Sequence, residues 1–359
     1  MTRIIALYLP QFHEIPENDE WWGEGHTEWR SCKNAVPLFR KHYQPRIPLN
    51  EHYYDLTDPK EQEWQSRIAM AYGIDGFCYY HYWFQGKLLL EKPAEMMLKN
   101  IKVKIPFCFS WANHSWTNSL RKKGRHFLIK QEYGDKDDWI KHFYYLLPFF
   151  KDKRYIKISA KPVIIIYDAA NIPCWDEMQA CWEKLSKENG IDGIYYISTL
   201  KLIGDQSFAE HHGFDAQFEY QPRYSVGMGR KTIYAFQYNT RRLVCRDILK
   251  KVFSAKYKNV WNHIIQEKHP HNIKTFLGAY TDWDTSARWG KQGEVHIGSS
   301  PELFEKYLRI QYQKSQEYNN EFLFITAWNE WSEGAYLEPD EKWKYGYLNA
   351  IKRVKEGNE

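Results

Sequence analysis

Residues 322–328 read F-L-F-I-T-A-W, a run without a charged side chain, and the polar segment N-E-W-S-E-G follows at 329–334. Apolar residues at consecutive positions are typical of parallel strands buried on both faces, because a half-exposed sheet shows alternation. Seven further runs of this kind precede it, at 3–9, 74–82, 105–111, 162–167, 193–198, 214–219 and 275–280. The chain therefore predicts eight buried strands.

Helical patterns fill the intervals between these runs. Asp58-Pro59 and Ser300-Pro301 each place a capping residue before a proline, and residues 176–189 show an apolar stripe. Strands that alternate with helices predict an α/β fold, a single (β/α)₈ TIM barrel over residues 1–359. The rival, a doubly wound sheet, lacks a G-x-G-x-x-G turn after an early run.

Two connections are long for such a barrel, one at about 10–57 and an insertion at about 220–241. Long loops after barrel strands usually shape the active face. We therefore expect these two segments to border the substrate site.

Aromatic residues make up 17% of the chain, with 16 Trp and 27 Tyr. A core uses few Trp because a buried indole N–H needs a hydrogen-bond partner. Flat apolar rings suit the C–H faces of sugars, so this composition favours an oligosaccharide or polysaccharide ligand. A large aromatic core is the alternative explanation.

The formal net charge of +5 is small for 359 residues. It is not concentrated in a nucleic-acid-binding module, so no nucleic acid is expected as a partner. The basic run R-K-K-G-R at 121–125 could meet an acidic glycan, a lipid diphosphate or a membrane surface, or be a solvated loop. Peripheral membrane association through a lipid-linked glycan is a further expectation, and the oligomeric state stays open.

The six cysteines form no C-x-x-C pair, which argues against a zinc site or a disulfide framework. The start of the chain has only about six apolar residues before Pro10, too few for a secretory signal. We expect a cytoplasmic protein that needs no metal and no cofactor.

Reactive residues of a (β/α)₈ barrel gather at the carboxyl ends of its strands. We expect these strand-end and loop side chains to bind substrate: Tyr8, Trp22, Trp29, Tyr80, His81, Trp83, Trp111, Asn113, Glu219, Trp283, Asp284, Arg288, Trp328, Asn329 and Trp331. Six strand-end residues should open onto one cleft: Tyr8, Tyr80, Trp111, Glu219, Trp283 and Glu330.

Some of these residues have an alternative role that the sequence leaves open. His81 could be a structural hydrogen-bonder, and Arg288 could hold an acidic sugar or pair with Asp284. Asp282-Trp283-Asp284 has the Asp-x-Asp spacing of a metal site in nucleotide-sugar transferases, or it binds sugar hydroxyls.

The segment W-N-E-W-S-E-G holds the candidate catalytic residues, Glu330 and Glu333. Glycosyl transfer usually needs one group to protonate the leaving oxygen and a second near the anomeric carbon. Residues three apart would point to opposite faces of a continuing strand, and Gly334 permits the turn that aims both into a cleft.

Four segments resemble one known family. They are A-L-Y-L-P-Q-F-H-E-I-P-E-N-D-E-W-W-G-E-G-H-T-E-W (6–29), G-F-C-Y-Y-H-Y-W-F (76–84), F-S-W-A-N-H-S-W (109–116) and W-N-E-W-S-E-G-A-Y-L-E-P (328–339). The chain looks like the glycoside hydrolase family 99-like domain, in the branch labelled as WbsX-type glycosyltransferases. The resemblance covers nearly the whole chain.

The resemblance implies roles for both carboxylates. Family 99 proper contains retaining endo-α-mannosidases with a similar N-E-W-x-E-G segment. By resemblance, Glu330 takes a proton from the 2-hydroxyl of the sugar to give a 1,2-anhydro intermediate, and Glu333 is the general acid and then the base. We therefore expect a protonated Glu333 and an ionised Glu330 in the resting enzyme. Ser332 stands where family 99 proper tends to have His.

The expected function is retaining glycosyl-bond chemistry, of endo-glycosidase or transglycosidase type, on a cell-surface polysaccharide or lipid-linked oligosaccharide. The WbsX-type branch is associated with gene clusters for O-antigen (lipopolysaccharide) and capsule synthesis. One alternative is a glycosyltransferase that uses an activated sugar donor in that biosynthesis. The other is a non-catalytic glycan-binding barrel.

Overall fold

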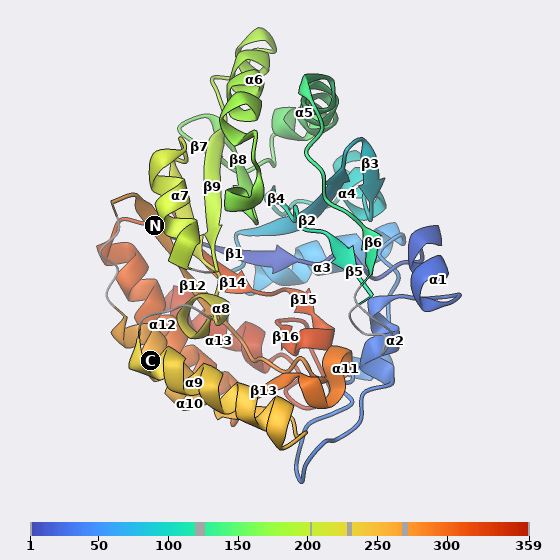
Figure 1. The fold of residues 1–359 in the computed structure, drawn as a ribbon, viewed down its shortest axis with the longest axis vertical. Helices are drawn as coiled ribbons and strands as arrows, with labels where there is room; N and C mark the ends of the chain where they lie inside the picture. Colours follow the sequence, from blue (N-terminus) through green and yellow to red (C-terminus); the bar gives the residue numbers. More distant parts are fainter. Residues whose placement is uncertain (1, 119–125, 202, 228–231, 268–271, 358–359) are drawn as a thin grey trace.

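Eight parallel strands close into a barrel (Figure 1). The structure is a computed structural model that describes residues 2–118, 126–201, 203–227, 232–267 and 272–357. The strands are β1 (Arg3–Tyr8), β2 (Gly76–Phe84), β4 (Phe107–Trp111), β8 (Lys161–Ile166), β9 (Tyr195–Leu200), β10 (Ala216–Glu219), β12 (Lys274–Tyr280) and β14 (Phe322–Thr326). Their order is β1-β14-β12-β10-β9-β8-β4-β2, and β1 also pairs with β2. Each predicted run forms one strand, which confirms the (β/α)₈ barrel.

Helices pack outside the strands. The larger ones are α3 (Pro59–Ala71), α4 (Lys92–Lys99), α5 (Lys136–Lys151), α6 (Trp175–Glu188), α7 (Ile203–His211), α10 (Tyr257–Gln266), α12 (Pro301–Glu317) and α13 (Gly346–Glu356). The predicted caps form: an Asp58 carboxylate oxygen accepts from the Lys60 N–H at 2.9 Å, and Ser300 Oγ accepts from the Leu303 N–H at 3.3 Å. No helix of the described segments is long and apolar enough to cross a membrane.

The long segment between β1 and α3 folds into α1 (Pro16–Trp22), α2 (Glu28–Lys33) and the 3₁₀ turn η1 (Leu49–Glu51). The segment after β10 forms α8 (Arg223–Val226), α9 (Ile233–Leu243), the π-helical turn η3 (Val244–Ile248) and β11 (Phe253–Lys256). Strand β11 pairs with β13 (Glu294–Ile297), which lies between β12 and α12 in the chain.

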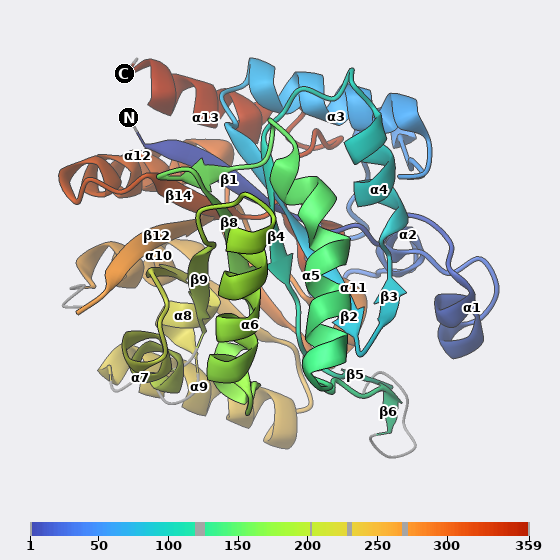
Figure 2. The ribbon, with the colours of Figure 1, turned by 90° about the horizontal axis from the view of Figure 1, so that it is seen from above.

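Short elements complete the ends of the barrel. They are β3 (Lys87–Leu89), β5 (Trp116–Thr117), β6 (Phe127–Ile129), β7 (Lys157–Ile158), η2 (Ala169–Asn171), α11 (Ser286–Trp289), η4 (Gly290–Gln292), β15 (Asn329–Glu330), η5 (Trp331–Glu333) and β16 (Ala335–Tyr336). Figure 2 shows β5, β6 and α9 at one end of the molecule, with the two chain ends at the other. The basic run at 121–125 lies outside the described residues.

Candidate active site

A cavity of about 430 Å³ lies at the carboxyl ends of the barrel strands. Both candidate carboxylates, Glu330 and Glu333, line it, as do Trp22, Tyr80 and Arg288 from the predicted set. The other lining residues are Leu9, Gln11, His26, Glu28, Ser31, Tyr82, Ala112, His114, Ser115, Trp116, Thr117, Leu128, Tyr167, Tyr220 and Trp289. Rings, amides and charged groups therefore share one wall, as sugar binding requires.

The chain turns sharply between the two carboxylates. Strand β15 ends at Glu330, the single 3₁₀ turn η5 contains Glu333, and Gly334 follows at φ 65° in the left-handed region. A Cβ at Gly334 would approach the Arg46 guanidinium carbon and the Asp284 Cβ, each to 2.9 Å. The glycine thus allows both the backbone turn and the close contact behind it, as the sequence predicts.

The residues beside Glu330 are fixed by buried hydrogen bonds. Asn329 Oδ1 accepts from the Leu9 N–H at 2.7 Å and Nδ2 donates to the Leu9 carbonyl at 2.9 Å, which ties the turn to the end of β1. Trp331 Nε1 donates to Glu338 Oε2 at 2.6 Å. These contacts hold Glu330 between two immobilised neighbours.

Glu338 accepts two further hydrogen bonds, from Tyr54 OH at 2.8 Å and from Gln65 Nε2 at 2.9 Å. Burial raises the pKa of this carboxyl to about 8, although these donors favour its charged form. Glu338 therefore joins the first long loop, α3 and the turn that carries Glu330 and Glu333 at one buried acid.

Arg288, on α11, lies among three carboxylates of the cavity. Its guanidinium donates to Glu333 Oε1 at 2.7 Å and to Glu28 Oε1 at 2.6 Å, and it lies 3.8 Å from Glu330 Oε2. Ser332 Oγ also donates to Glu28 Oε1. The arginine thus pairs with cavity carboxylates and not with Asp284, and its single charge cannot balance three anions.

The shortage of positive charge affects Glu330 most. Burial, followed by the charge of Glu333, raises the pKa of Glu330 well above its ordinary value, and Arg288 only partly opposes this. Among the described residues, no hydrogen bond reaches the buried Oε2 of Glu330. The direction of this shift favours the protonated form of Glu330. It runs against the expectation of an ionised Glu330, and the direct contact with Arg288 belongs to Glu333.

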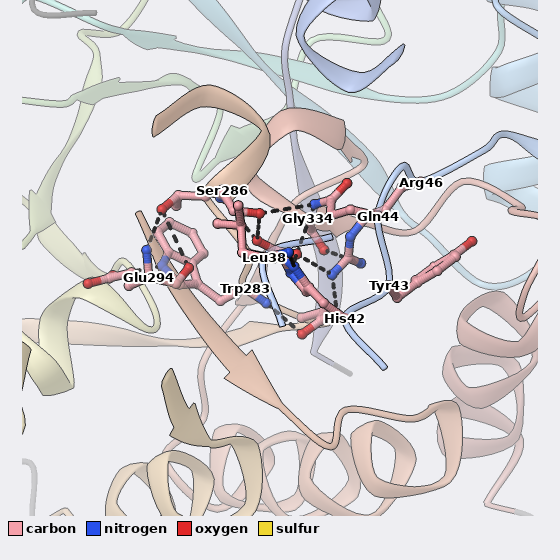
Figure 3. A network of polar contacts seen from close by, with 12 residues as sticks. Leu38, His42, Tyr43, Gln44, Arg46, Trp283, Ser286, Glu294 and Gly334 are labelled. Carbon is pink, nitrogen blue, oxygen red and sulfur yellow. Dashed lines mark hydrogen bonds and ion pairs between the residues drawn. The ribbon is translucent and has the colours of Figure 1, made fainter. Parts of the chain in front are cut away.

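The aspartates of Asp282-Trp283-Asp284 have a different surrounding. Figure 3 shows His42, Gln44 and Arg46 of the first long loop close to Trp283 and Gly334. Asp282 accepts from Arg46 at 2.8 Å, and Asp284 contacts His42 Nε2 at 2.9 Å and Gln44 Nε2 at 2.8 Å. Burial disfavours the charged form of Asp284, but the His42 hydrogen bond and the Arg46 charge hold its pKa below the ordinary value. Both aspartates thus anchor the first long loop, and neither borders the cavity, which corrects the expected position of Asp284.

Strand β2 separates its side chains by alternation. Tyr80 and Tyr82 border the cavity, whereas His81 and Trp83 lie on the other face against α5. His81 Nε2 contacts His142 Nε2 at 2.8 Å, and Trp83 Nε1 donates to Asp138 at 3.2 Å. His81 and Trp83 were expected at the site; their place in the packed layer between strand and helix corrects this.

The remaining predicted residues are buried in the wall and do not border the cavity: Tyr8, Trp29, Trp111, Asn113, Glu219, Trp283, Trp328, Asn329 and Trp331. Several have found partners there: Tyr8 OH donates to Gln65 at 2.6 Å, and Trp283 Nε1 donates to Glu294 at 2.8 Å. The expectation that six strand-end residues share one cleft is therefore wrong for four of them, Tyr8, Trp111, Glu219 and Trp283. A buried indole or hydroxyl favours a hydrogen-bond partner, and the wall supplies one for Tyr8 and Trp283.

The sequence reasoning placed no substrate contact at Tyr82, Trp116, Tyr167, Tyr220 or Trp289. Tyr167 and Tyr220 directly follow β8 and β10, and Tyr220 takes the place expected for Glu219. The strand-end rule could have found both tyrosines. Trp116 and Trp289 lie in short elements that show no strand or helix pattern. Trp116 ends the family-like segment 109–116, whereas no local signal marks Trp289.

No group of three or more His, Cys, Asp and Glu side chains within the described segments is arranged to hold a metal ion. Arg46 and His42 already contact the aspartates with metal-site spacing.

The chain belongs to the glycosyltransferase WbsX family, whose model matches residues 4–351. Over 98% of its length it is 32% identical to an uncharacterized protein, WxcX, of Xanthomonas campestris pv. campestris strain B100, and equally to WxcX of strain ATCC 33913. The chain spans about half, 49%, of the length of these relatives.

Two solved structures share the fold of this chain over nearly its whole length. A GH99 endo-α-mannosidase from Bacteroides thetaiotaomicron matches with a TM-score of 0.59 at 14% identity, covering 99% of this chain and 97% of that one. A glycoside hydrolase-like protein matches with a TM-score of 0.62 at 10% identity, covering 98% and 93%. At such identities the likeness shows the fold. The family and the fold together support a glycan-related function.

Proposed function

We propose that this protein catalyses retaining glycosyl-bond chemistry on a cell-surface polysaccharide or a lipid-linked oligosaccharide. The observation that carries the proposal is the Glu330–Glu333 pair, which lines an aromatic cavity and shares one arginine with a third carboxylate. Such a pair holds one proton and one charge, the two forms that acid–base chemistry needs. Trp22, Trp116 and Trp289 would supply ring faces for sugars.

In the proposed reaction, Glu330 removes the proton of the sugar 2-hydroxyl while O2 attacks the anomeric carbon. The bond to the leaving oxygen breaks, and Glu333 donates a proton to that oxygen. Water or an acceptor hydroxyl then opens the 1,2-anhydro ring at the anomeric carbon, giving its proton to Glu333, and O2 regains a proton from Glu330. Two inversions give net retention, with hydrolysis or transfer decided by the acceptor.

Burial and the charge of Glu333 favour the protonated form of Glu330, so the proposed reactive state requires a proton to move from Glu330 to Glu333. The proton count of the pair does not change. A 2-hydroxyl that donates to Glu330 stabilises its charged form, and a glycosidic oxygen that accepts from Glu333 stabilises its protonated form. We propose that substrate binding drives this exchange. In the reverse assignment, Glu330 would be the acid.

The direct test uses purified protein with surface polysaccharide from the producing cells, followed by size analysis and measurement of new reducing ends. We expect shorter products or transferred chains from the parent and none from the Glu330→Gln/Glu333→Gln double variant. Unchanged polysaccharide and lipid-linked oligosaccharide with the parent, in spite of measurable binding, would overturn the proposal in favour of a glycan-binding barrel.

A second candidate is a glycosyltransferase with an activated donor, which the family description favours. It predicts that a nucleotide sugar raises the melting temperature of the protein and that an acceptor glycan releases the nucleotide. Under the first proposal, nucleotide sugars do neither.

A further inference from the structure

The outer face of α9 and of the following turn η3 is apolar and exposed. Six of the 13 exposed large apolar side chains of the described residues fall between 233 and 249: Ile233, Phe236, Leu243, Val244, Ile248 and Leu249. Ile233, Phe236 and Ile248 are 72%, 66% and 71% exposed. We call the exposed side of residues 233–251 the α9 face. A concentration of this kind marks an interaction surface, because single exposed apolar residues are usually scattered.

The inner side of the same helix is fixed to the barrel. Ala235 and Tyr238 are buried, and Tyr238 OH contacts His296 Nε2 of β13 at 2.9 Å. Arg242 donates to Glu294 of β13 at 3.3 Å. The α9 face is therefore the outer side of a firmly held helix.

Positive charge accompanies the apolar side chains. Residues 241–251 include five basic residues and one acid, Asp247. Arg246 neutralises that acid with two hydrogen bonds, at 2.7 and 2.8 Å. Arg241, Lys250 and Lys251 are exposed beside the apolar side chains. Exposed apolar residues bordered by Arg and Lys complement a surface of anionic headgroups over acyl chains.

The α9 face lies at the same end of the molecule as the cavity. Figures 1 and 2 show α9 along the edge of that end, and β6, which bears the 62% exposed Phe127, lies there too. Glu294, which holds Arg242, also accepts from Trp283 between β12 and α11, the helix of Arg288. The α9 face is thus connected through Glu294 to the segment that leads into α11, and α11 carries Arg288 of the cavity wall.

We propose that the α9 face binds an anionic lipid surface, with Ile233, Phe236 and Ile248 entering the acyl region and the basic residues among the headgroups. The apolar positions are interrupted by Gln237 and Thr240, and one edge is basic, a pattern typical of interfacial helices. Bound in this way, the protein holds the open end of its barrel at the membrane. Lipid binding does not depend on the proposed glycosyl chemistry.

The test is co-sedimentation of the full chain with vesicles of phosphatidylglycerol and phosphatidylethanolamine, compared with vesicles of phosphatidylcholine alone. We expect the protein to bind the anionic vesicles. Its affinity for the neutral vesicles should be lower by about 10-fold or more. Binding should fall as NaCl rises, because exposed charges are screened.

Two variants assign the binding to the face. Phe236→Ser with Ile248→Ser, and Lys250→Gln with Lys251→Gln, should each lower anionic-vesicle binding about 10-fold or more. The matched control is Ile101→Ser, since Ile101 is 80% exposed but precedes β4 at the amino end of the barrel. It should bind as the parent does.

Absence of vesicle binding by the parent would overturn the proposal. So would equal losses in the Ile101→Ser control, or unchanged binding in both double variants. Size-exclusion chromatography with light scattering tests whether a second copy of the chain binds the α9 face instead of a lipid surface. A dimer that Phe236→Ser with Ile248→Ser dissociates, together with no binding to vesicles, would make the face a self-association surface.

Discussion

Two pairs of acidic residues follow neighbouring strands of this barrel, and they differ in the charge that surrounds them. Asp282 and Asp284, after β12, meet Arg46 and His42 from the first long loop. Glu330 and Glu333, after β14, share Arg288 with Glu28. The first pair is held by these buried partners, which lower the pKa of Asp284, and it acts as a structural anchor. The second pair shares one arginine with a third carboxylate, has a raised pKa at Glu330 and borders a cavity. Counter-charge thus separates acids that hold a loop from acids that can do chemistry.

The largest expected effects follow from replacing the carboxylates of the second pair by amides. Glu330→Gln and Glu333→Gln should each lower turnover by about 10²-fold or more, the usual scale of general acid–base catalysis. Turnover is measured on polysaccharide and on a glycoside with an activated aryl leaving group. The aryl substrate should partly rescue Glu333→Gln only, because its leaving oxygen needs little protonation.

Both variants should melt near the parent, because a catalytic carboxylate is seldom optimal for stability. Equal rescue of the two variants would contradict the assigned roles, and rescue of Glu330→Gln alone would make Glu330 the acid. Full activity in either variant would contradict the glycosidase-like mechanism.

The next effect concerns the first pair. Asp284→Asn should lower the free energy of unfolding by about 3 kcal/mol, because it leaves His42 and Arg46 buried beside a neutral amide. The stabilisation lost is present above the pKa of unfolded Asp, about 3.9, and disappears as the pH falls below the lowered folded pKa. Urea unfolding at pH 7 measures the change. Asp176→Asn, an exposed acid near His212, is the control and should shift stability little. Equal shifts in both variants would refute the anchor role.

A smaller effect is expected at Glu338, the buried acid behind the catalytic turn. Its pKa of about 8 lies above that of an unfolded Glu, so the folded protein binds the extra proton and stability falls as the pH rises between these values. The slope is about 1.4 kcal/mol per pH unit at most. Glu338→Gln should flatten this pH dependence, although its single acceptor oxygen meets three donors and lowers stability overall.

Unfolding midpoints between pH 5 and 8 measure the slope. Glu341→Gln, in the same segment but paired with Lys344 at the surface, should keep the parent slope. An unchanged slope in Glu338→Gln would mean that another group titrates.

The smallest expected effect is that of chelation. Arg46 and His42 already balance Asp282 and Asp284, so exhaustive removal of divalent cations should leave turnover unchanged. Activity that disappeared with EDTA and returned with Mn²⁺ or Mg²⁺ would reverse the comparison, and the aspartate pair would become the reactive one.

The sequence by itself determined the barrel and the place of the turn that carries Glu330 and Glu333. Continuous apolar runs at regular intervals are local patterns, and a parallel barrel is the arrangement that buries both faces of eight such strands. Glu330, Glu333 and Gly334 lie within five residues of one another, so their turn could also be predicted.

Only the tertiary structure decided which side chains face the cavity and which acid has its pKa raised. Alternation divides Tyr80 and Tyr82 from His81 and Trp83, but the helix that packs outside, α5, determines which face is inward. The counter-ions come from far along the chain: Arg46 lies 236 residues from Asp282, and Glu28 lies 260 residues from Arg288. A pKa depends on burial and on such neighbours, and neither is a local property of the sequence.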